Sequence, residues 1–210
     1  MLRVFCDFDG TITNRDSIVF LTERFGGGEA FREETLLKIV SGEWSVFEAI
    51  EREMATVSVS WEEALSVLRA EIQVDPHFGG FVDWCRDEGI PIAVLSSGMG
   101  PVVEAFVGKY DVPIFAHAVK IESSGWRYRR RPENDKAALL GALCEQDEVV
   151  YIGDGTSDVS VIPLVDHLMA KEGRFLAEHC RASGVKFVPF RDFSEIRNEV
   201  RKIWAESGRR

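Results

Sequence analysis

The sequence predicts an α/β fold in which helices cover both faces of a parallel sheet. Three observations carry this prediction. A short apolar run opens the chain, later apolar runs of strand length alternate with segments of helical periodicity, and no internal repeat or low-complexity segment interrupts the alternation. The 210 residues are enough for one full core with one small accessory domain.

The first third of the chain is predicted to be one strand followed by helices. Residues 2–8 form the expected interior strand. Apolar residues then recur at three- and four-residue steps in four segments, which we expect to be helices. These segments are 14–25, 29–40, 45–57 and 60–72. The last one begins with a capping box, in which Ser60 is the N-cap and Glu63 lies three residues later. About 60 residues without a strand signal indicate a helical insert. We therefore expect a cap domain at 14–76 and a core formed by 1–13 and 77–210.

Beyond Asp75-Pro76 the predicted strands alternate with helices. Strands are expected at 90–95, 112–119, 148–152, 167–170 and 185–188. Helices are expected at 78–88, 101–109, 136–145, 159–165, 175–183 and 193–204. The segment 122–131 is predicted to be a hairpin or flap around Ser123-Ser124-Gly125, because serine and glycine favour turns.

Composition excludes several classes of function. A formal net charge of −10 argues against a nucleic-acid surface, which needs a concentrated positive field. No apolar run approaches the ~18 residues of a membrane span, and no basic segment precedes an apolar one as in a signal peptide. The cysteines lack metal-ligand spacing and are expected to be buried thiols of a cytoplasmic protein. They are Cys6, Cys85, Cys144 and Cys180. The sequence carries no signal of oligomeric state.

The segment Asp7-Phe8-Asp9-Gly10-Thr11 is the first candidate site. It follows directly on the first predicted strand. Residues two apart in a strand face the same way, so Asp7 and Asp9 are expected to point into one small space. Burying two like charges together is costly unless a cation or a reaction requires them. The pentapeptide therefore predicts a chemical site.

Polar residues follow two further predicted strands. Ser96-Ser97-Gly98 comes after one, and Asp154 and Asp158 come after another, while Lys136 opens a helix between them. Ligands of an open α/β sheet bind beyond the carboxyl ends of the strands. The resulting set of carboxylates, an ammonium and hydroxyls fits Mg²⁺ together with a phosphoryl group. One carboxylate can then attack phosphorus, and a second can transfer the proton.

These four elements occur in the order seen in phosphatases of the haloacid dehalogenase superfamily, which the chain resembles over its whole Rossmann-like core. The resemblance implies that Asp7 is the nucleophile and Asp9 the general acid and base. It implies a Mg²⁺ cofactor bound by Asp7, by the Asp9 backbone carbonyl and by Asp154, with Asp158 acting directly or through water. The residues expected to bind phosphate or substrate are Thr11, Asp16, Ser96, Ser97, Gly98, Lys136 and Ser157.

The helical insert is similar to the cap of the phosphoserine-phosphatase-like branch. Asp16 corresponds to an acidic residue that phosphoserine phosphatases carry after the first motif. Glu53, however, stands where those enzymes have an arginine for the substrate carboxylate; Arg52, one position earlier, could substitute for it only if the register is shifted. The segments 96–99 and 187–193 look more like the methionine-salvage phosphatase that acts on 2-hydroxy-3-keto-5-methylthiopentenyl-1-phosphate. The expected substrate is a small phosphorylated metabolite, with that ester as the first candidate and phosphoserine as the alternative.

Two other functions use a similar set of residues. A phosphomutase would return the phosphoryl group to its substrate. A receiver-like signalling module would retain the aspartyl-phosphate, but such modules are shorter and have no reason to carry a helical insert.

Overall fold

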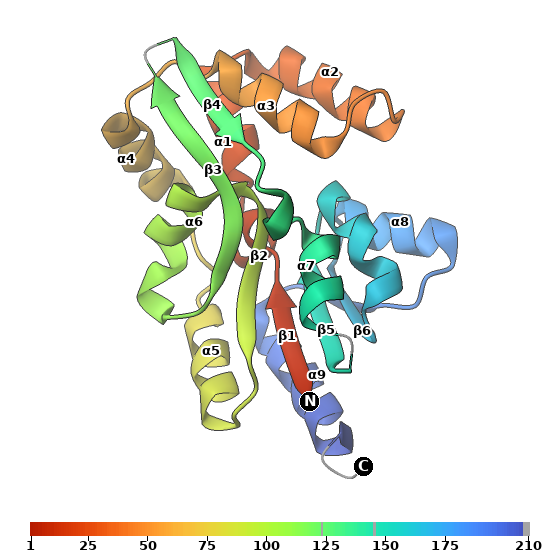
Figure 1. The fold of residues 1–210 in the computed structure, drawn as a ribbon. Helices are drawn as coiled ribbons and strands as arrows, with labels where there is room; N and C mark the ends of the chain where they lie inside the picture. Colours follow the sequence, from red (N-terminus) through yellow and green to blue (C-terminus); the bar gives the residue numbers. More distant parts are fainter. Residues whose placement is uncertain (123, 145, 208–210) are drawn as a thin grey trace.

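A seven-stranded sheet forms the centre of the computed structural model, which describes residues 1–122, 124–144 and 146–207 (Figure 1). The strand order is β4-β3-β2-β1-β5-β6-β7. All neighbouring strands are parallel except β3 and β4, which form an antiparallel hairpin at one edge. The strands are β1 (Leu2–Cys6), β2 (Ile92–Met99), β3 (Ile114–Glu122), β4 (Gly125–Arg129), β5 (Glu148–Gly153), β6 (His167–Lys171) and β7 (Val188–Phe190). The predicted α/β class is confirmed.

The helices follow the predicted segments closely. Four of them lie within the predicted insert: α1 (Ser17–Phe25), α2 (Gly28–Val40), α3 (Val46–Thr56) and α4 (Trp61–Glu71). The others that the structure describes are α5 (Phe78–Asp87), α6 (Gly100–Val107), α7 (Lys136–Leu143), α8 (Phe175–Ser183) and α9 (Phe193–Ser207). Among the described residues, no helix combines the length and apolar character that a membrane crossing requires.

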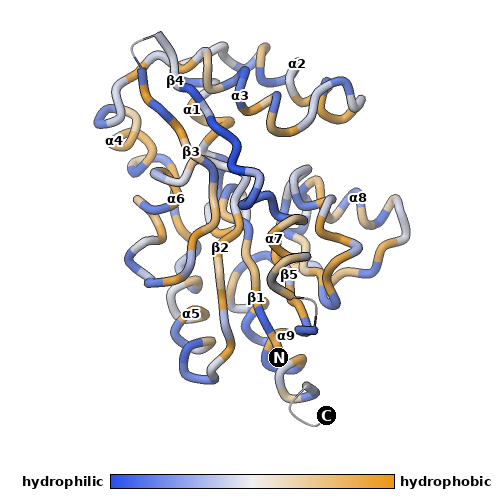
Figure 2. Tube along the Cα trace, in the orientation of Figure 1, coloured by the Kyte–Doolittle hydropathy of each residue, from blue (hydrophilic) through white to orange (hydrophobic). Residues whose placement is uncertain are grey.

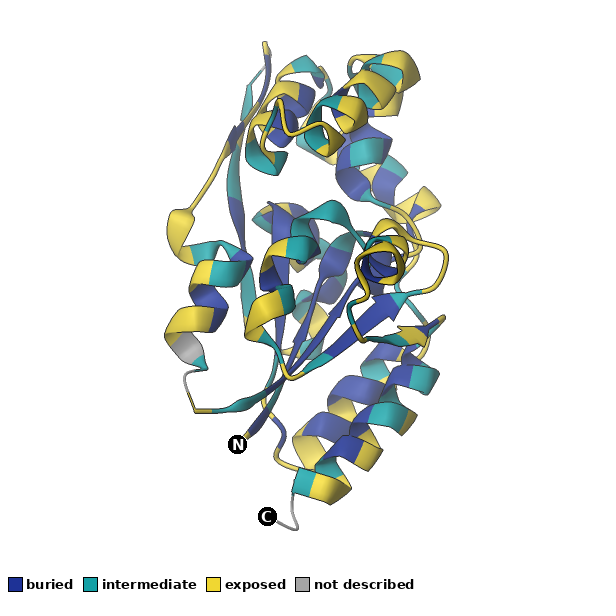
Figure 3. Ribbon diagram, turned by 90° about the vertical axis from the view of Figure 1, so that its right-hand side faces the viewer, coloured by how far each residue is buried: buried dark blue, intermediate teal, exposed yellow. Residues whose placement is uncertain are grey.

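The first strand lies in the middle of the sheet because both of its faces are apolar. Leu2, Val4 and Cys6 belong to the larger core cluster, whereas Phe5 belongs to the cluster on the opposite face. This alternation is what a strand buried on both sides requires. Hydrophobic segments follow the central strands in Figure 2, and the exposed surface lies mainly on the outer faces of the helices in Figure 3.

Several boundaries differ from the prediction. Strand β2 continues to Met99, so Ser96-Ser97-Gly98 belongs to the strand and not to a loop; an irregularity between Leu95 and Met99 allows it to continue pairing with β3. The last strand is Val188–Phe190, not 185–188. The predicted helix at 159–165 is a 3₁₀ segment, Thr156–Leu164, that contains Pro163. The predicted turn residue Ser123 and the predicted helix end at Glu145 lie outside the described residues.

Helices α3 and α4 both begin with capping interactions, of which only that of α4 was predicted. Ser60 accepts a hydrogen bond from the Glu63 backbone N–H, which is one half of the predicted box. The complete capping box, with both reciprocal bonds, is formed by Ser45 and Glu48 at the start of α3. It fixes the start of the helix that carries Glu53.

The helical insert lies over the carboxyl ends of the strands. Helices α1, α2 and α3 occupy this position in Figure 1, and the two ends of the insert meet where Thr13 pairs with Val74. We propose that residues 14–76 form a cap over the sheet, and we call helices α1–α4 the cap helices.

The β3–β4 hairpin connects the edge of the sheet to the cap helices. In Figure 1 it extends away from the sheet and runs along α3. Trp126 of β4 is fully buried, packs against Trp61 at a ring distance of 6.1 Å, and donates a hydrogen bond to the Val59 carbonyl at 2.9 Å. Gly125 has a φ of 130°, and a Cβ atom there would overlap the Ala55 carbonyl oxygen of α3. The backbone of the hairpin at Gly125 therefore lies directly against the backbone of α3. A side chain at this position would prevent the contact.

We expect Gly125→Ala to destabilise the protein by about 3 kcal/mol, because it adds both backbone strain and overlap with α3. Gly173→Ala is the matched control, since Gly173 also has a positive φ of 71° but has open space around it. This control is expected to cost about 1 kcal/mol from strain alone. Urea unfolding measures both; equal losses would contradict the close contact between hairpin and helix.

Candidate active site

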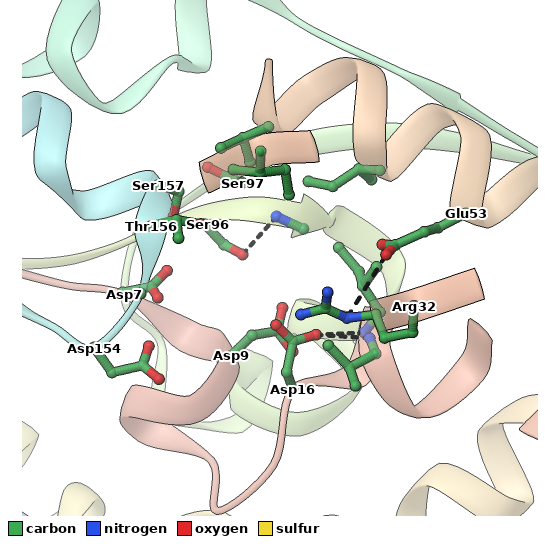
Figure 4. Close-up of a pocket in the computed structure, with 17 residues that line it drawn as sticks. Asp7, Asp9, Asp16, Arg32, Glu53, Ser96, Ser97, Asp154, Thr156 and Ser157 are labelled. Atoms are coloured by element: carbon green, nitrogen blue, oxygen red, sulfur yellow. Dashed lines mark hydrogen bonds and ion pairs between the residues drawn. The ribbon is translucent and has the colours of Figure 1, made fainter. Parts of the chain in front are cut away.

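The candidate site is a small pocket of about 110 Å³ between the carboxyl ends of β1, β2 and β5 and the cap helices (Figure 4). Strand β1 lies between β2 and β5, so the residues that follow these strands meet. The Asp7 backbone N–H donates to the Ile152 carbonyl at 2.8 Å and keeps Asp7 aligned with β5. The site residues predicted at three strand ends therefore do come together.

Lys136 connects two buried carboxylates. Its Nζ lies 2.7 Å from Oδ1 of Asp7 and 2.6 Å from Oδ1 of Asp158, and it also donates to the Ser157 hydroxyl at 3.0 Å. Burial alone would lower the pKa of Lys136, but the charges of Asp158 and Asp7 outweigh it and raise that pKa. The side chain is therefore a permanent cation beside Asp7, which lines the pocket.

The carboxylate of Asp158 accepts hydrogen bonds at both of its oxygens. Oδ1 accepts hydrogen bonds from Lys136 and from the Tyr151 hydroxyl, the latter at 2.6 Å, and Oδ2 accepts from the backbone N–H groups of Asp154 and Gly155 at 2.9 Å each. A carboxylate offers about four lone-pair sites. Four donors occupy them here, which favours contact of Asp158 with a cation through water over direct ligation.

The donor set fits a Mg²⁺ ion. One carboxylate oxygen from each of Asp7, Asp154 and Asp158 lies within 4.8 Å of the others. Mg²⁺ prefers such oxygen ligands. Gly10, with a φ of 77°, leaves the space beside Asp154 open, because a Cβ atom there would collide with the Asp154 carboxylate. The Thr11 hydroxyl donates to the same carboxylate at 3.2 Å, so Thr11 orients Asp154 in this structure.

The mutual repulsion of these buried carboxylates also favours a bound cation. Burial, followed by repulsion from Asp158, raises the pKa of Asp7 to about 7. Burial, followed by repulsion from Asp7 and Asp158, raises the pKa of Asp154 above its usual range. A divalent ion would relieve this repulsion.

The carboxylate of Asp9 belongs to a different part of the pocket. Its Oδ1 accepts a hydrogen bond from the Ser17 backbone N–H at 2.7 Å. Burial, followed by the charge of Asp16, raises its pKa. A raised pKa favours the protonated form of the carboxyl group, which is the form that a general acid needs. Asp9 differs from Asp7 in its partners, because Asp9 accepts from the Ser17 backbone whereas Asp7 accepts from Lys136.

Asp16 lies on the cap side of the pocket and caps helix α1. Its Oδ1 accepts hydrogen bonds from the backbone N–H groups of Ile18 and Val19 at 2.8 and 2.9 Å. This is a standard N-cap arrangement, which accounts for an acidic residue at this position without a ligand. Because Asp16 also lines the pocket, it can contact a substrate as well.

The segment Ser96-Ser97-Gly98 lines the opposite wall. The Gly98 N–H donates to Oγ of Ser96 at 2.9 Å, and the Tyr128 hydroxyl donates to the Ser97 carbonyl at 2.8 Å. A Cβ atom on Gly98 would lie 2.6 Å from Oδ2 of Asp9. The glycine therefore allows the Asp9 carboxyl group to approach the strand closely.

Three residues at or near the site were not predicted from the sequence. Lys171, at the end of β6, donates to the carbonyls of Gly10 and Thr11 at 2.8 and 3.1 Å and so holds the first motif in place. The rule that ligands bind beyond the carboxyl ends of the strands, applied to β6, would have identified Lys171 from the sequence. Tyr151 lies inside β5, and Arg32 lies on α2 at the pocket wall. Neither belongs to a sequence motif, and only the packing of distant elements reveals them.

Glu53 is the buried acidic residue of the cap helices. Burial, followed by repulsion from Asp16 and Glu23, raises the pKa of Glu53 to about 7 despite the opposing effect of Arg32. The folded protein thus retains this proton at pH values where the unfolded chain has lost it. Stability from this group is therefore present at low pH and is lost as the pH rises through about 7.

We expect the stability of the Glu53→Gln variant, relative to wild type, to increase as the pH rises. Relative to wild type, its free energy of unfolding should rise by about 2 kcal/mol between pH 4 and pH 8, because glutamine does not ionise. Urea unfolding at both pH values measures this difference. Glu51→Gln, at an exposed position of the same helix, is the control and should show no such change. A constant difference for Glu53→Gln would contradict the raised pKa.

Comparisons with known proteins agree with this geometry. Residues 4–162 match the haloacid dehalogenase-like hydrolase family. The chain is 32% identical to Pdp3-interacting factor 1 of Schizosaccharomyces pombe, over 98% of this chain and 97% of that protein. It is 26% identical to a polyol phosphate phosphatase of Saccharomyces cerevisiae, over 96% and 93% of the two chains. It is 25% identical to the 2-hydroxy-3-keto-5-methylthiopentenyl-1-phosphate phosphatase of Bacillus mycoides, over 96% and 97%.

A solved structure supports the same fold. A phospho-aspartyl intermediate analogue of phosphoserine phosphatase superposes with a TM-score of 0.72 at 18% identity, covering 93% of this chain and 96% of that one. The parallel sheet and its flanking helices match, and nothing in these comparisons favours a signalling module. The chain belongs to the haloacid dehalogenase-like hydrolases and is a phosphatase of their phosphoserine-phosphatase-like branch.

Proposed function

We propose that this phosphatase is Mg²⁺-dependent and hydrolyses a small phosphorylated metabolite through an aspartyl-phosphate at Asp7. One observation carries the proposal: the buried Asp7 carboxylate lies 2.7 Å from the Lys136 ammonium, in the same pocket as Asp9. An acid, a cation and a nucleophile of this kind are what phosphoryl transfer from an ester needs.

In the first step, an oxygen of Asp7 attacks phosphorus, and the bond between phosphorus and the ester oxygen breaks. Asp9 donates its proton to the leaving alcohol oxygen. In the second step, the Asp9 carboxylate takes a proton from water, whose oxygen attacks phosphorus and releases Asp7. Lys136 and the Ser96 hydroxyl would hold the phosphoryl oxygens through both steps.

Asp7 and Asp154 would bind Mg²⁺ directly, with the Asp9 backbone carbonyl, and Asp158 would contact it through water. When bound, the ion would neutralise negative charge on the phosphoryl group. Asp158 also holds Lys136 and Tyr151, so its role extends to keeping the ammonium in position. The cytoplasmic location remains a prediction from the cysteines, all four of which are free.

The relatives suggest two substrate classes. The ester of methionine salvage is supported by the Bacillus mycoides relative and by the apolar residues Ile39, Val46 and Ile50 in the pocket, which could contact a methylthio group. A polyol phosphate is supported by the Saccharomyces cerevisiae relative and by the polar residues Asp16, Arg32 and Glu53 in the same pocket.

We expect Asp7→Asn to lower kcat on the order of 10⁴-fold or more, because it removes the nucleophile, and Asp9→Asn to lower it about 10²- to 10⁴-fold. Release of phosphate from an aryl phosphate measures both. Chelation of divalent ions by EDTA should abolish release, and added Mg²⁺ should restore it.

Asp87→Asn, at an exposed position on α5, is the matched control and should retain wild-type activity. Phosphate release by Asp7→Asn at the wild-type rate, or release that EDTA does not affect, would exclude the proposed mechanism. Recovery of an isomerised phosphate ester in place of free phosphate would indicate a mutase.

A substrate panel tests the two classes. With the methionine-salvage ester, a polyol phosphate and phosphoserine at equal concentration, phosphoserine should have the lowest kcat/KM. The physical reason is that Glu53, which is buried and is ionised above about pH 7, would repel the phosphoserine carboxylate, so the assay is run above that pH. A clear preference for phosphoserine would show that this reading of Glu53 is wrong.

A further inference from the structure

A second polar group lies in the pocket, on the cap side away from Asp7. Arg32 projects from α2 and Glu53 from α3, with Asp16 next to them at the start of α1 (Figure 4). The side chain of Glu53 is 5% exposed and that of Arg32 is 21% exposed. None of these three side chains takes part in the bond-forming and proton-transfer steps assigned to Asp7 and Asp9.

Several atoms of this group have no hydrogen-bond partner among the described residues. They are Nε and Nη1 of Arg32 and Oε1 of Glu53, and all three are buried. The nearest approach between the two side chains is 3.6 Å, from Nε to Oε1, which is too long for a good hydrogen bond. Buried donors and acceptors of charged groups are rarely left unpaired, so these atoms point to a ligand.

The charges of the group restrict that ligand. A single guanidinium faces two acidic side chains, those of Glu53 and Asp16. A carboxylate on the ligand would have to approach Arg32 beside the buried Glu53, where a like charge is disfavoured. A hydroxyl group meets neither obstacle, because its oxygen can accept from Arg32 while its proton is donated to Glu53.

The remaining wall of the pocket is apolar. Ile39, Val46 and Ile50 line the same pocket. Such a surface suits the carbon backbone of a short molecule, whereas the polar atoms at the far end fix its orientation. A short chain with a phosphate at one end and hydroxyl groups at the other satisfies both parts of the pocket.

We propose that Arg32 and Glu53 select the substrate by binding its hydroxyl groups, and that the substrate is the phosphate monoester of a short, uncharged polyol. This inference rests on the proposed function, since it concerns the group from which phosphate is removed. It assigns Arg32 and Glu53 to substrate specificity and leaves the phosphoryl transfer to the residues at the strand ends.

The test compares glycerol 1-phosphate with 1-propyl phosphate, which lacks the hydroxyl groups but has the same carbon chain. With wild type and Mg²⁺, kcat/KM for glycerol 1-phosphate should be higher by at least about 10²-fold, because two hydrogen bonds to charged groups are lost with the propyl ester. Arg32→Met and Glu53→Leu should each lower kcat/KM for glycerol 1-phosphate by about 10- to 100-fold and leave that for 1-propyl phosphate within about threefold.

The double variant Arg32→Met with Glu53→Leu guards against misfolding, because it leaves neither charge unpaired. It should fold, hydrolyse both esters and no longer discriminate between them. Arg52→Met is the matched control. Arg52 lies next to Glu53 on α3 but is exposed and stacks on Trp44 at 4.4 Å, so this change should not alter the preference.

Three outcomes would overturn the inference while the proposed function stands. Wild type could hydrolyse both esters equally well, the variants could lose activity on both esters in parallel, or phosphoserine could be preferred to glycerol 1-phosphate. Parallel loss would mean that the pair only stabilises the cap helices. No release of phosphate from either ester by wild type with Mg²⁺ would instead contradict the proposed function itself.

Discussion

The contact of Lys136 with Asp7 and Asp158 is the interaction on which the rest of the site depends. Two carboxylates buried at the ends of neighbouring elements would repel each other, and the ammonium between them makes their burial possible. Asp158 in turn anchors the loop after β5 through two backbone N–H groups and fixes Tyr151. Removing the cation would therefore disturb the nucleophile, the loop and the position of Asp154 together.

The site also depends on how the cap helices are attached. They follow the first motif directly, so Asp16 begins α1 only nine residues after Asp7 in the numbering of the chain. On the other side, the β3–β4 hairpin packs against α3 and α4 through Gly125 and Trp126. The wall that carries Arg32 and Glu53 is thus connected to the sheet at both ends. This arrangement keeps substrate recognition and phosphoryl transfer in one small pocket while assigning them to separate parts of the chain.

Much of the fold and of the chemistry could be predicted because the signals are local. The helical periodicity of α1–α4 and the apolar runs of β1 and β5 depend on neighbouring residues, and the strand-end rule brings Asp7, Ser96 and Asp154 together without further information. The prediction was wrong where tertiary pairing decided the outcome. Pairing with β3 continues β2 through Ser96-Ser97-Gly98, and pairing with β6 shifts the last strand to Val188–Phe190.

The sequence by itself determined the class of fold, the helical insert and the strand-end residues proposed to handle phosphate, because each follows from periodicity or from motifs of fixed spacing. Only the tertiary structure identified Arg32 as a pocket residue. Helix α2 carries no sequence motif, and its packing against α1 and α3 places Arg32 at the pocket. Only the structure distinguished the surroundings of Asp158 from those of Asp7 and Asp154 as well. Asp158 has all four lone-pair sites occupied, whereas Asp7 and Asp154 are crowded by like charge, and neither property depends on the spacing of residues along the chain.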